Sequence, residues 1–255
     1  MAGVLHTHFA GATVSNDATQ AVSDGHKHAW SALSRQGYAL TSDESVGLAE
    51  KFRPNFSQAY FNEWTLHHDE GDWPADRLRA RDVIRYQWHE GSLTLQRHDA
   101  ITITDRAGIS GRREHRRVEL LDDPQALDLI RAFLELVPPG RRQPDGTFGV
   151  NLFRTFTNVV TKPHHDDEEF IIVYVLDRVG DGAETYLYHP ADVSDDGEIK
   201  AAPILRQRLD PGDIIIFDDK AFKHGATPLT NPVGGTARRD ALVCTVDYRD
   251  TYLAG

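Results

Sequence analysis

Histidine and aspartate stand together at two places in this 255-residue chain, and both places offer ligands for a metal ion. The segment His67–Asp69 reads HHD, and the segment His164–Glu168 reads HHDDE. Residues i and i+2 of an extended segment point to the same face, so a His-x-Asp triplet can direct one nitrogen and one oxygen at a common point. With thirteen histidines in the chain, one such triplet is expected by chance, and the surroundings must distinguish the two copies.

The two copies have different residues on their C-terminal side. The run Phe170–Leu176 (FIIVYVL) comes after the second copy and is typical of a fully buried strand. The first copy leads into Glu70–Pro74 (EGDWP), a composition typical of a loop. We therefore interpret His67–Asp69 as a solvated loop and expect the second copy to supply two metal ligands.

On spacing alone, these two ligands are either His164 with Asp166 or His165 with Asp167. A third ligand must come from elsewhere, and His224 is the best candidate, because a tight turn, an apolar strand and a His-Gly step form a rigid frame around it. Two histidines and one carboxylate on one face of an octahedron leave three positions open, an arrangement typical of non-haem Fe(II) oxygenases. In such an oxygenase, 2-oxoglutarate takes two of these positions and O2 takes the third.

The distal carboxylate of 2-oxoglutarate needs a bidentate cationic partner, which arginine provides. Arg238 and Arg239 follow His224 at the head of the next predicted strand. We choose Arg239 as the co-substrate ligand. A solvated strand end is the alternative interpretation of both arginines.

The elements that would position these residues are mainly strands. We expect strands over 37–40, 83–88, 92–95, 101–104, 149–156, 170–176, 184–188, 204–209, 213–217 and 241–248, with Gly and Pro turns between many of them. Helices are expected over 19–34, over 43–52, where Pro54 ends the helix, and over 124–137, where Asp123 is the N-cap. The fold prediction is a single α+β domain, 1–255, in which a mostly helical N-terminal layer, 1–80, packs on a double-stranded β-helix (cupin-like jelly-roll) core, 81–255.

Composition and charge limit the classes of partner. Hydrophobic residues make up 40% of the chain and charged residues 26%, which is typical of a globular domain. The net charge of -11 gives no attraction for nucleic acid, so we expect a small-molecule substrate and no nucleic-acid partner, while a homo-oligomer is compatible with the sequence. The basic segment Arg112–Arg117 is interpreted as a solvated loop, with an anion contact or a lid as the alternative.

The single cysteine and the absence of long apolar runs bear on where in the cell the protein is expected. Cys244 excludes an internal disulfide and a cysteine-based zinc site, and its apolar neighbours predict a buried side chain. The chain has no obvious signal peptide and no apolar run of about 18 residues, so we expect no membrane span and a cytoplasmic location.

From residue 164 onward, the chain resembles the bacterial 2-oxoglutarate/iron dioxygenase family that includes L-isoleucine 4-hydroxylase. Members carry an H-x-D-D-E segment before a buried strand, which corresponds here to His164–Glu168. They also carry an H-[AG]-x-T-P-L segment followed by an R-D-x-L strand, which corresponds to His224–Leu229 and Arg239–Leu242. The family pattern favours the register of His164 with Asp166 and favours Arg239 over its neighbour.

The resemblance implies an enzyme that uses Fe(II), 2-oxoglutarate and O2. It implies hydroxylation of an unactivated sp3 carbon of a free L-amino acid or a close relative, with release of succinate and CO2. The metal ligands would be His164, Asp166 and His224, and Arg239 would bind the co-substrate.

A free amino acid presents a carboxylate and an ammonium group. Arg85 and Arg154 lie inside predicted strands, where an arginine is costly unless it is paired, so either is a candidate for the carboxylate. Tyr86 is a candidate hydrogen-bond donor to the co-substrate or substrate, and Asp167 or Glu168 is a candidate for the ammonium group. Structural salt bridges are the alternative interpretation of all five residues.

Three other functions stay open on the sequence. One is the same chemistry on a carrier-bound or peptidyl residue. The others are a cupin-like metalloenzyme and a non-catalytic sensor, neither of which needs 2-oxoglutarate. A site of the last two kinds would share the His/Asp/His ligands but would have no use for Arg239.

Overall fold

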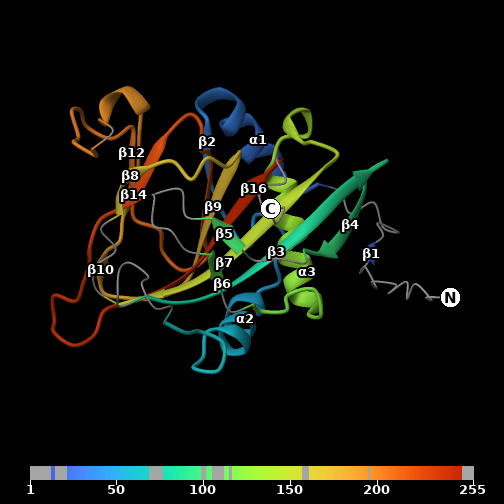
Figure 1. Ribbon diagram of the computed structural model, residues 1–255, viewed down its shortest axis with the longest axis horizontal. Coiled ribbons are helices and arrows are strands. Elements are labelled where there is room, and N and C mark those ends of the chain that lie inside the picture. Colours follow the sequence, from blue (N-terminus) through green and yellow to red (C-terminus); the bar gives the residue numbers. More distant parts are fainter. Residues whose placement is uncertain are drawn as a thin grey trace.

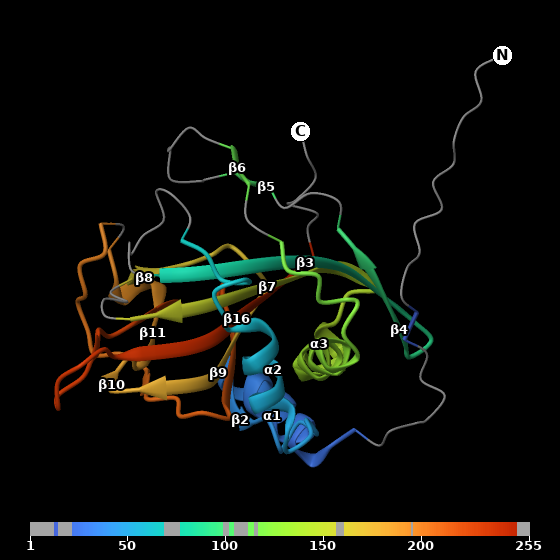
Figure 2. The same cartoon turned by 90° about the horizontal axis from the view of Figure 1, so that it is seen from below.

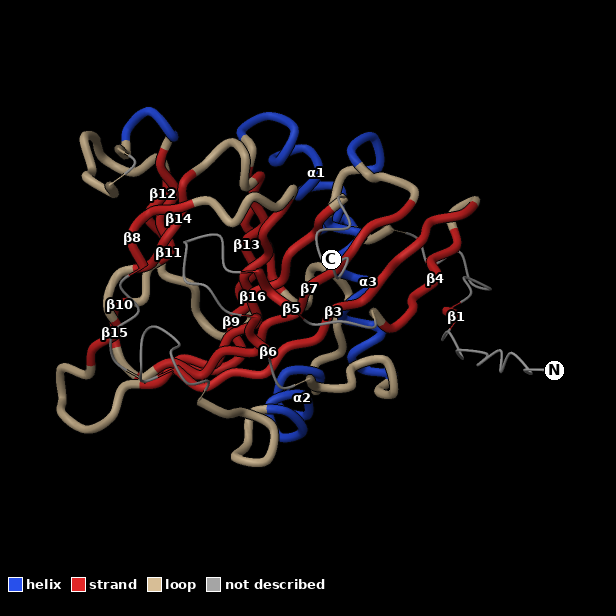
Figure 3. The backbone as a smooth tube through the Cα atoms, in the orientation of Figure 1, coloured by secondary structure: helices blue, strands red, loops and turns tan. Residues whose placement is uncertain are grey.

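The computed structural model describes residues 22–68, 77–98, 117–156, 161–194 and 196–248, together with the backbone of short strands at 13–14, 102–104 and 112–114. Strands dominate this part of the chain (Figure 3). Among these residues, no helix combines the length and the apolar character needed to cross a bilayer.

The larger of two main sheets has eight strands in the order β1-β4-β3-β7-β16-β9-β13-β2, and every neighbouring pair is antiparallel. Its strands are β1 (Thr13–Val14), β2 (Tyr38–Ser42), β3 (Arg77–His89), β4 (Ser92–Arg97), β7 (Asp145–Thr155), β9 (Phe170–Val179), β13 (Asp213–Asp218) and β16 (Arg238–Asp247).

A smaller four-stranded sheet, ordered β12-β11-β14-β8, lies at one end of the molecule (Figure 1). Its strands are β8 (Thr161–His164), β11 (Thr185–Tyr188), β12 (Leu205–Gln207) and β14 (Lys223–Ala226). Side chains of β9 and β13 form one apolar cluster with Leu187 of β11 and with Phe222. The two antiparallel sheets therefore enclose a common core, as expected for a jelly roll.

The remaining elements are short. β5 (Thr102–Thr104) pairs with β6 (Arg112–Glu114), and β10 (Asp181–Gly182) pairs with β15 (Leu229–Thr230). Two single 3-10 turns, η1 (Pro139–Arg141) and η2 (Pro190–Asp192), complete the described elements.

Three helices cover the other face of the large sheet (Figure 2). They are α1 (Asp24–Gln36), α2 (Phe52–Tyr60) and α3 (Pro124–Leu136). Ser23 caps α1, and Gly37 ends it in the left-handed conformation (φ 79°) that glycine adopts without strain. Asp123 accepts a hydrogen bond from the backbone N–H of Gln125 at the start of α3, so the predicted helix over 124–137 is confirmed.

Alternation along β16 separates the two faces of the large sheet. Leu242, Cys244 and Val246 belong to the apolar cluster shared with the helices, whereas Val243 packs against the cluster between the two sheets. Cys244 is fully buried, as predicted. Because side chains alternate along a strand, Arg239 lies on the same face as Val243, toward the space between the sheets.

The predicted helix over 43–52 is wrong. Turns occupy most of this segment, and α2 starts at Phe52 with Pro54 in its first turn. Proline is tolerated there because the N–H groups of the first turn have no partner within the helix. The predicted helical layer of residues 1–80 is only partly seen, because β2 and the start of β3 belong to the sheet.

Candidate metal centre

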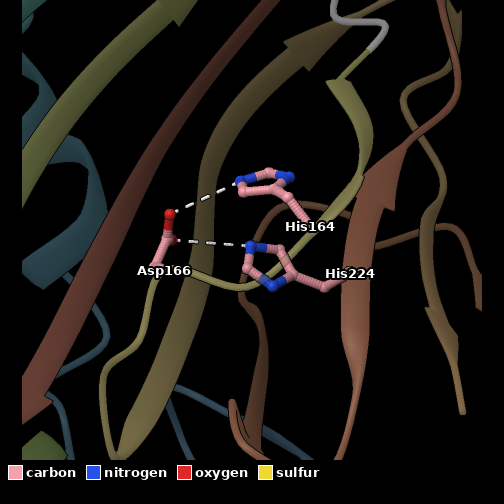
Figure 4. Close-up of side chains that lie close together, drawn as sticks. All are labelled: His164, Asp166 and His224. Atoms are coloured by element: carbon pink, nitrogen blue, oxygen red, sulfur yellow. Dashed lines mark ion pairs between the residues drawn. The ribbon is translucent and has the colours of Figure 1, made fainter. Parts of the chain in front are cut away.

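Two histidines and one aspartate converge at the edge of the small sheet. The ligand atoms of His164, Asp166 and His224 all lie within 4.8 Å of one another. His164 Nε2 is 3.4 Å from Asp166 Oδ1, and His224 Nε2 is 3.6 Å from Asp166 Oδ2. Figure 4 shows both imidazole rings turned toward the carboxylate.

Strand pairing places the two histidines together. His164, the last residue of β8, lies directly opposite His224 of β14 in the antiparallel register. Side chains of directly opposed residues leave the sheet on the same face and lie close together, and the two ring centroids are 4.5 Å apart. Asp166 follows two residues after His164, in the loop that leads to β9.

The other ring nitrogens point at oxygen atoms. His164 Nδ1 donates to the backbone oxygen of Lys162 at 2.9 Å. His224 Nδ1 lies 3.2 Å from Asp219 Oδ1, although the two groups are not aligned as a hydrogen bond. An acceptor at Nδ1 favours the tautomer that leaves Nε2 free to bind a metal. This donor set, with two free imidazole nitrogens and one carboxylate, fits a divalent transition metal such as Fe(II).

The charges of the three side chains are coupled. Burial opposes ionisation of Asp166, but the hydrogen bond from His164 and the positive charges of the two histidines outweigh it and lower the pKa of Asp166 to about 2. Burial likewise disfavours the protonated form of His164, but Asp166 raises the pKa of this imidazole above its ordinary value. The Asp166 carboxylate is therefore ionised at neutral pH, and a metal would compete with protons for the His164 imidazole.

The alternative pair of ligands, His165 with Asp167, has other surroundings. His165 Nδ1 lies 2.5 Å from the backbone oxygen of Asp219, and Asp167 is an exposed residue with a left-handed backbone (φ 61°). In the earlier triplet, the backbone of His67 forms an isolated bridge with Arg79. Asp69 lies outside the described residues. The geometry thus selects His164 with Asp166.

The two adjacent arginines have opposite environments. Arg238 forms an ion pair with Asp177 and lies 3.8 Å from Asp240. Arg239 is only 7% exposed, and within the described part of the chain its Nε and one terminal nitrogen have no hydrogen-bond partner. Burial, together with the charge of Arg178, lowers the pKa of Arg239 to about 10, so this guanidinium stays charged at neutral pH.

Two further ionisable residues lie beside the candidate metal ligands. Arg81 of β3 is 8% exposed, and its charge contributes to the low pKa of Asp166. Glu168 is 9% exposed, and its Oε2 has no hydrogen-bond partner among the residues that the structure describes. Burial, followed by the charges of Asp247 and Asp166, raises the pKa of Glu168 to about 8.

Sequence reasoning gave Arg81 no role, because only the fold brings β3 next to the loop after β8. Arg81 lies in β3 but before the predicted strand over 83–88, so the strand position that drew attention to Arg85 and Arg154 gave no signal for it.

The other predicted site residues lie elsewhere. Arg154 makes a two-pronged ion pair with Asp240, with both N–O distances at 2.7 Å, on the helix side of the sheet. Tyr86 is buried in the apolar cluster shared with the helices, and burial raises the pKa of its hydroxyl. Arg85 is exposed and lines a surface pocket with Tyr248. Because alternate strand residues share a face, Arg154 and Tyr86 point away from the metal centre.

The basic segment is partly described. Arg117 Nε donates to the buried carboxylate of Asp82 at 2.9 Å, so this arginine is a structural ion-pair partner. The backbone of Arg112–Glu114 forms β6, while the side chains of this strand and residues 115–116 lie outside the described residues.

Known proteins share this architecture. The sequence model of the 2OG-Fe dioxygenase family matches residues 65–245. A solved bsmA homologue from Methylobium petroleophilum has a TM-score of 0.68 at 20% identity, covering 92% of this chain and 97% of that one. IDO from Bacillus thuringiensis has a TM-score of 0.66 at 16% identity, covering 88% and 96%. A 2OG-Fe(II) oxygenase family oxidoreductase from Burkholderia pseudomallei has a TM-score of 0.54 at 16% identity, covering 89% and 91%. At these identities the structural likenesses concern the fold, and no curated protein matched the sequence.

Replacing either histidine of the triad should weaken metal binding. We expect His164→Ala and His224→Ala to reduce the affinity for Mn(II) by more than the roughly 10- to 100-fold that loss of an outer partner costs. The affinity is measured by calorimetric titration, with circular dichroism to verify folding. His67→Ala is the control, and a loss in that variant as large as in His164→Ala would contradict the assignment.

Proposed function

The chain belongs to the 2OG-Fe dioxygenase family, and from that premise we propose that it hydroxylates an sp3 carbon of a free L-amino acid or a close relative, with His164, Asp166 and His224 holding the iron. Enzymes of this family use Fe(II), 2-oxoglutarate and O2. When bound, the iron couples oxidative decarboxylation of 2-oxoglutarate, to succinate and CO2, with insertion of one oxygen atom into a substrate C–H bond.

The buried guanidinium of Arg239 supports the proposal that this chain binds 2-oxoglutarate as co-substrate. A charged group removed from water is costly unless an opposite charge accompanies it. Among the described residues, no carboxylate pairs with Arg239, and its side chain shares the inner face of β16 with Val243. A dicarboxylate that reaches the metal with one end and Arg239 with the other would supply the missing charge.

The register of the large sheet supports a binding surface for the substrate. Arg81 lies opposite Asn151, and Gly149, the next β7 residue on that face, lies opposite Thr245. A Cβ atom on Gly149 would be 2.6 Å from Thr245 Oγ1 and 3.5 Å from a terminal nitrogen of Arg81. Glycine therefore leaves Thr245 room at the centre of β7, whereas a Cβ would lie at ordinary contact distance from Arg81.

Two ionisable groups beside the candidate metal ligands complement an amino acid. Arg81 suits the substrate carboxylate, and Glu168 suits the ammonium group, because burial disfavours the ionised form of this carboxyl and a bound cation would favour it. We propose this pair in place of Arg154, because Arg154 is paired with Asp240 on the helix side of the sheet, away from the candidate metal ligands. Arg85 shares the face of Arg81 but lies about 13 Å further along the strand.

The proposal is tested with a panel of free amino acids. The protein is incubated with Fe(II), 2-oxoglutarate and ascorbate, and mass spectrometry detects the gain of one oxygen atom, with succinate measured in parallel. We expect at least one free L-amino acid to be hydroxylated with matching succinate release. Hydroxylation confined to peptides or carrier-bound residues would move the proposal to that substrate class, and the absence of any 2-oxoglutarate turnover would contradict it.

Arg239 should control 2-oxoglutarate binding, and Arg238 should not. Loss of a buried bidentate partner costs about 2–5 kcal/mol, because the co-substrate carboxylate stays desolvated and unpaired. We therefore expect Arg239→Ala to weaken 2-oxoglutarate binding by roughly 30- to 4,000-fold. Calorimetric titration of the Mn(II)-loaded protein measures this, and equal effects in Arg238→Ala would contradict the assignment.

Glu168 should control the affinity for the substrate ammonium group. We expect Glu168→Gln to raise the KM for the amino acid by about 10- to 100-fold, the effect of losing a hydrogen bond between charged groups. The Kd values for Mn(II) and 2-oxoglutarate should stay near wild type. Asp167→Asn, in the adjacent exposed residue, is the matched control. An unchanged KM in Glu168→Gln would remove Glu168 from the substrate site.

A further inference from the structure

A fully buried carboxylate lies beneath the metal ligands and has no part in the chemistry proposed above. Asp219 is 0% exposed and follows β13 in the turn that leads to β14. Its Oδ2 accepts hydrogen bonds from the backbone N–H groups of Asp166 and Glu168, both at 3.0 Å. Its Oδ1 lies 3.2 Å from His224 Nδ1. One side chain thus contacts both segments that carry ligands.

The loop after β8 is shaped around this carboxylate. Asp167 has a left-handed backbone, which turns the N–H groups on either side of it toward the same point. Such an arrangement of backbone donors forms an anion-binding concavity, and the side chain of Asp219 fills it. The backbone of Asp219 also contacts this loop, because its N–H donates to Glu169 O at 3.3 Å and its carbonyl oxygen lies 2.5 Å from His165 Nδ1.

The neighbouring aspartate has a different set of partners. Asp218 Oδ1 accepts hydrogen bonds from the N–H groups of Lys220 and Ala221 within the turn, and its Oδ2 lies 2.7 Å from Arg141. Asp218 therefore shapes the turn, whereas Asp219 joins the turn to the metal ligands.

We propose that Asp219 is a positioning residue for the metal centre, a proposal that rests on the metal site proposed above. It holds the loop so that Asp166 faces the two histidines, and its charge favours the proton on Nδ1 of His224. That tautomer presents Nε2 to the metal. Asp219 thereby arranges the three ligands before the metal arrives, so that less reorganisation opposes binding.

The substitution Asp219→Asn removes the negative charge of the side chain and keeps its size. The amide oxygen of asparagine can still accept from the two backbone N–H groups, so the loop has the means to fold, but the negative charge beside His224 is lost. We expect the Kd for Mn(II) to rise about 10- to 100-fold. The d–d absorption spectrum of the Co(II)-loaded variant should also differ from wild type, while the melting temperature of the metal-free protein changes little.

Asp218→Asn is the matched control, and it should bind Mn(II) with wild-type affinity. A Kd for Asp219→Asn within about twofold of wild type would overturn the proposal, as would equal weakening in both variants, which would assign the effect to the turn. If wild type bound no Mn(II) at all, the metal site itself would fail, an outcome distinct from failure of Asp219 alone.

If Asp219→Asn does not fold, the proposal can still be tested on the wild-type protein. In the Zn(II)-loaded protein with 15N-labelled histidine, nuclear magnetic resonance should detect a slowly exchanging Nδ1–H on His224, with Nε2 bound to the metal. Metal bound at Nδ1, or an Nδ1 proton that exchanges freely with water, would overturn the proposal.

Discussion

The proposed metal centre depends on the pairing of the two short strands β8 and β14. His164 and His224 face each other because β8 and β14 are antiparallel and in one particular register. A slip of one residue in either strand would turn one imidazole to the opposite face of the small sheet, and the ligand set would be lost. The contacts around Asp219 hold the ends of both strands, which limits such a slip where four-residue strands alone have few hydrogen bonds to prevent it.

Side chains alternate between the two faces of the large sheet, and the two faces have different surroundings. One face packs its apolar residues against α1, α2 and α3, and the fully buried Phe148, Phe170 and Tyr174 belong to that cluster. The other face places Arg81, Thr245 and Arg239 toward the small sheet. Substitutions on the first face would act through the free energy of unfolding, whereas on the proposed function substitutions on the second face would act through binding.

Features that are defined by neighbouring residues in the chain could be predicted from the sequence. The triplet before Phe170–Leu176 and the capped helix α3 are of this kind, because spacing, caps and apolar runs are local properties. The strands β8 and β14 were missed, since each has only four residues and gains its order from pairing with the other. Asp219 and Arg81 were missed for the same reason, because their partners lie far away in the chain.

Local rules also explain the incorrect helix over 43–52 and the choice of two arginines that the structure places away from the candidate metal ligands. Pro54 was interpreted as a helix end, although a proline in a first turn has the same sequence appearance. Arg154 and Arg85 were chosen because arginines in strands need partners, and that rule is sound. The partner of Arg154 proved to be Asp240 of the adjacent strand, which only the register of β7 with β16 reveals.

The uncompensated charge of Arg239 links the stability of the fold to metabolism. On its proposed role, the protein without 2-oxoglutarate keeps a buried cation that no described residue neutralises. A ligand that binds only the folded state adds stability in proportion to the logarithm of its concentration, about 2.7 kcal/mol at a hundredfold excess over Kd. The lifetime of the folded protein would then follow the supply of a central carbon metabolite, and starvation for that metabolite would remove the protein as well as its activity.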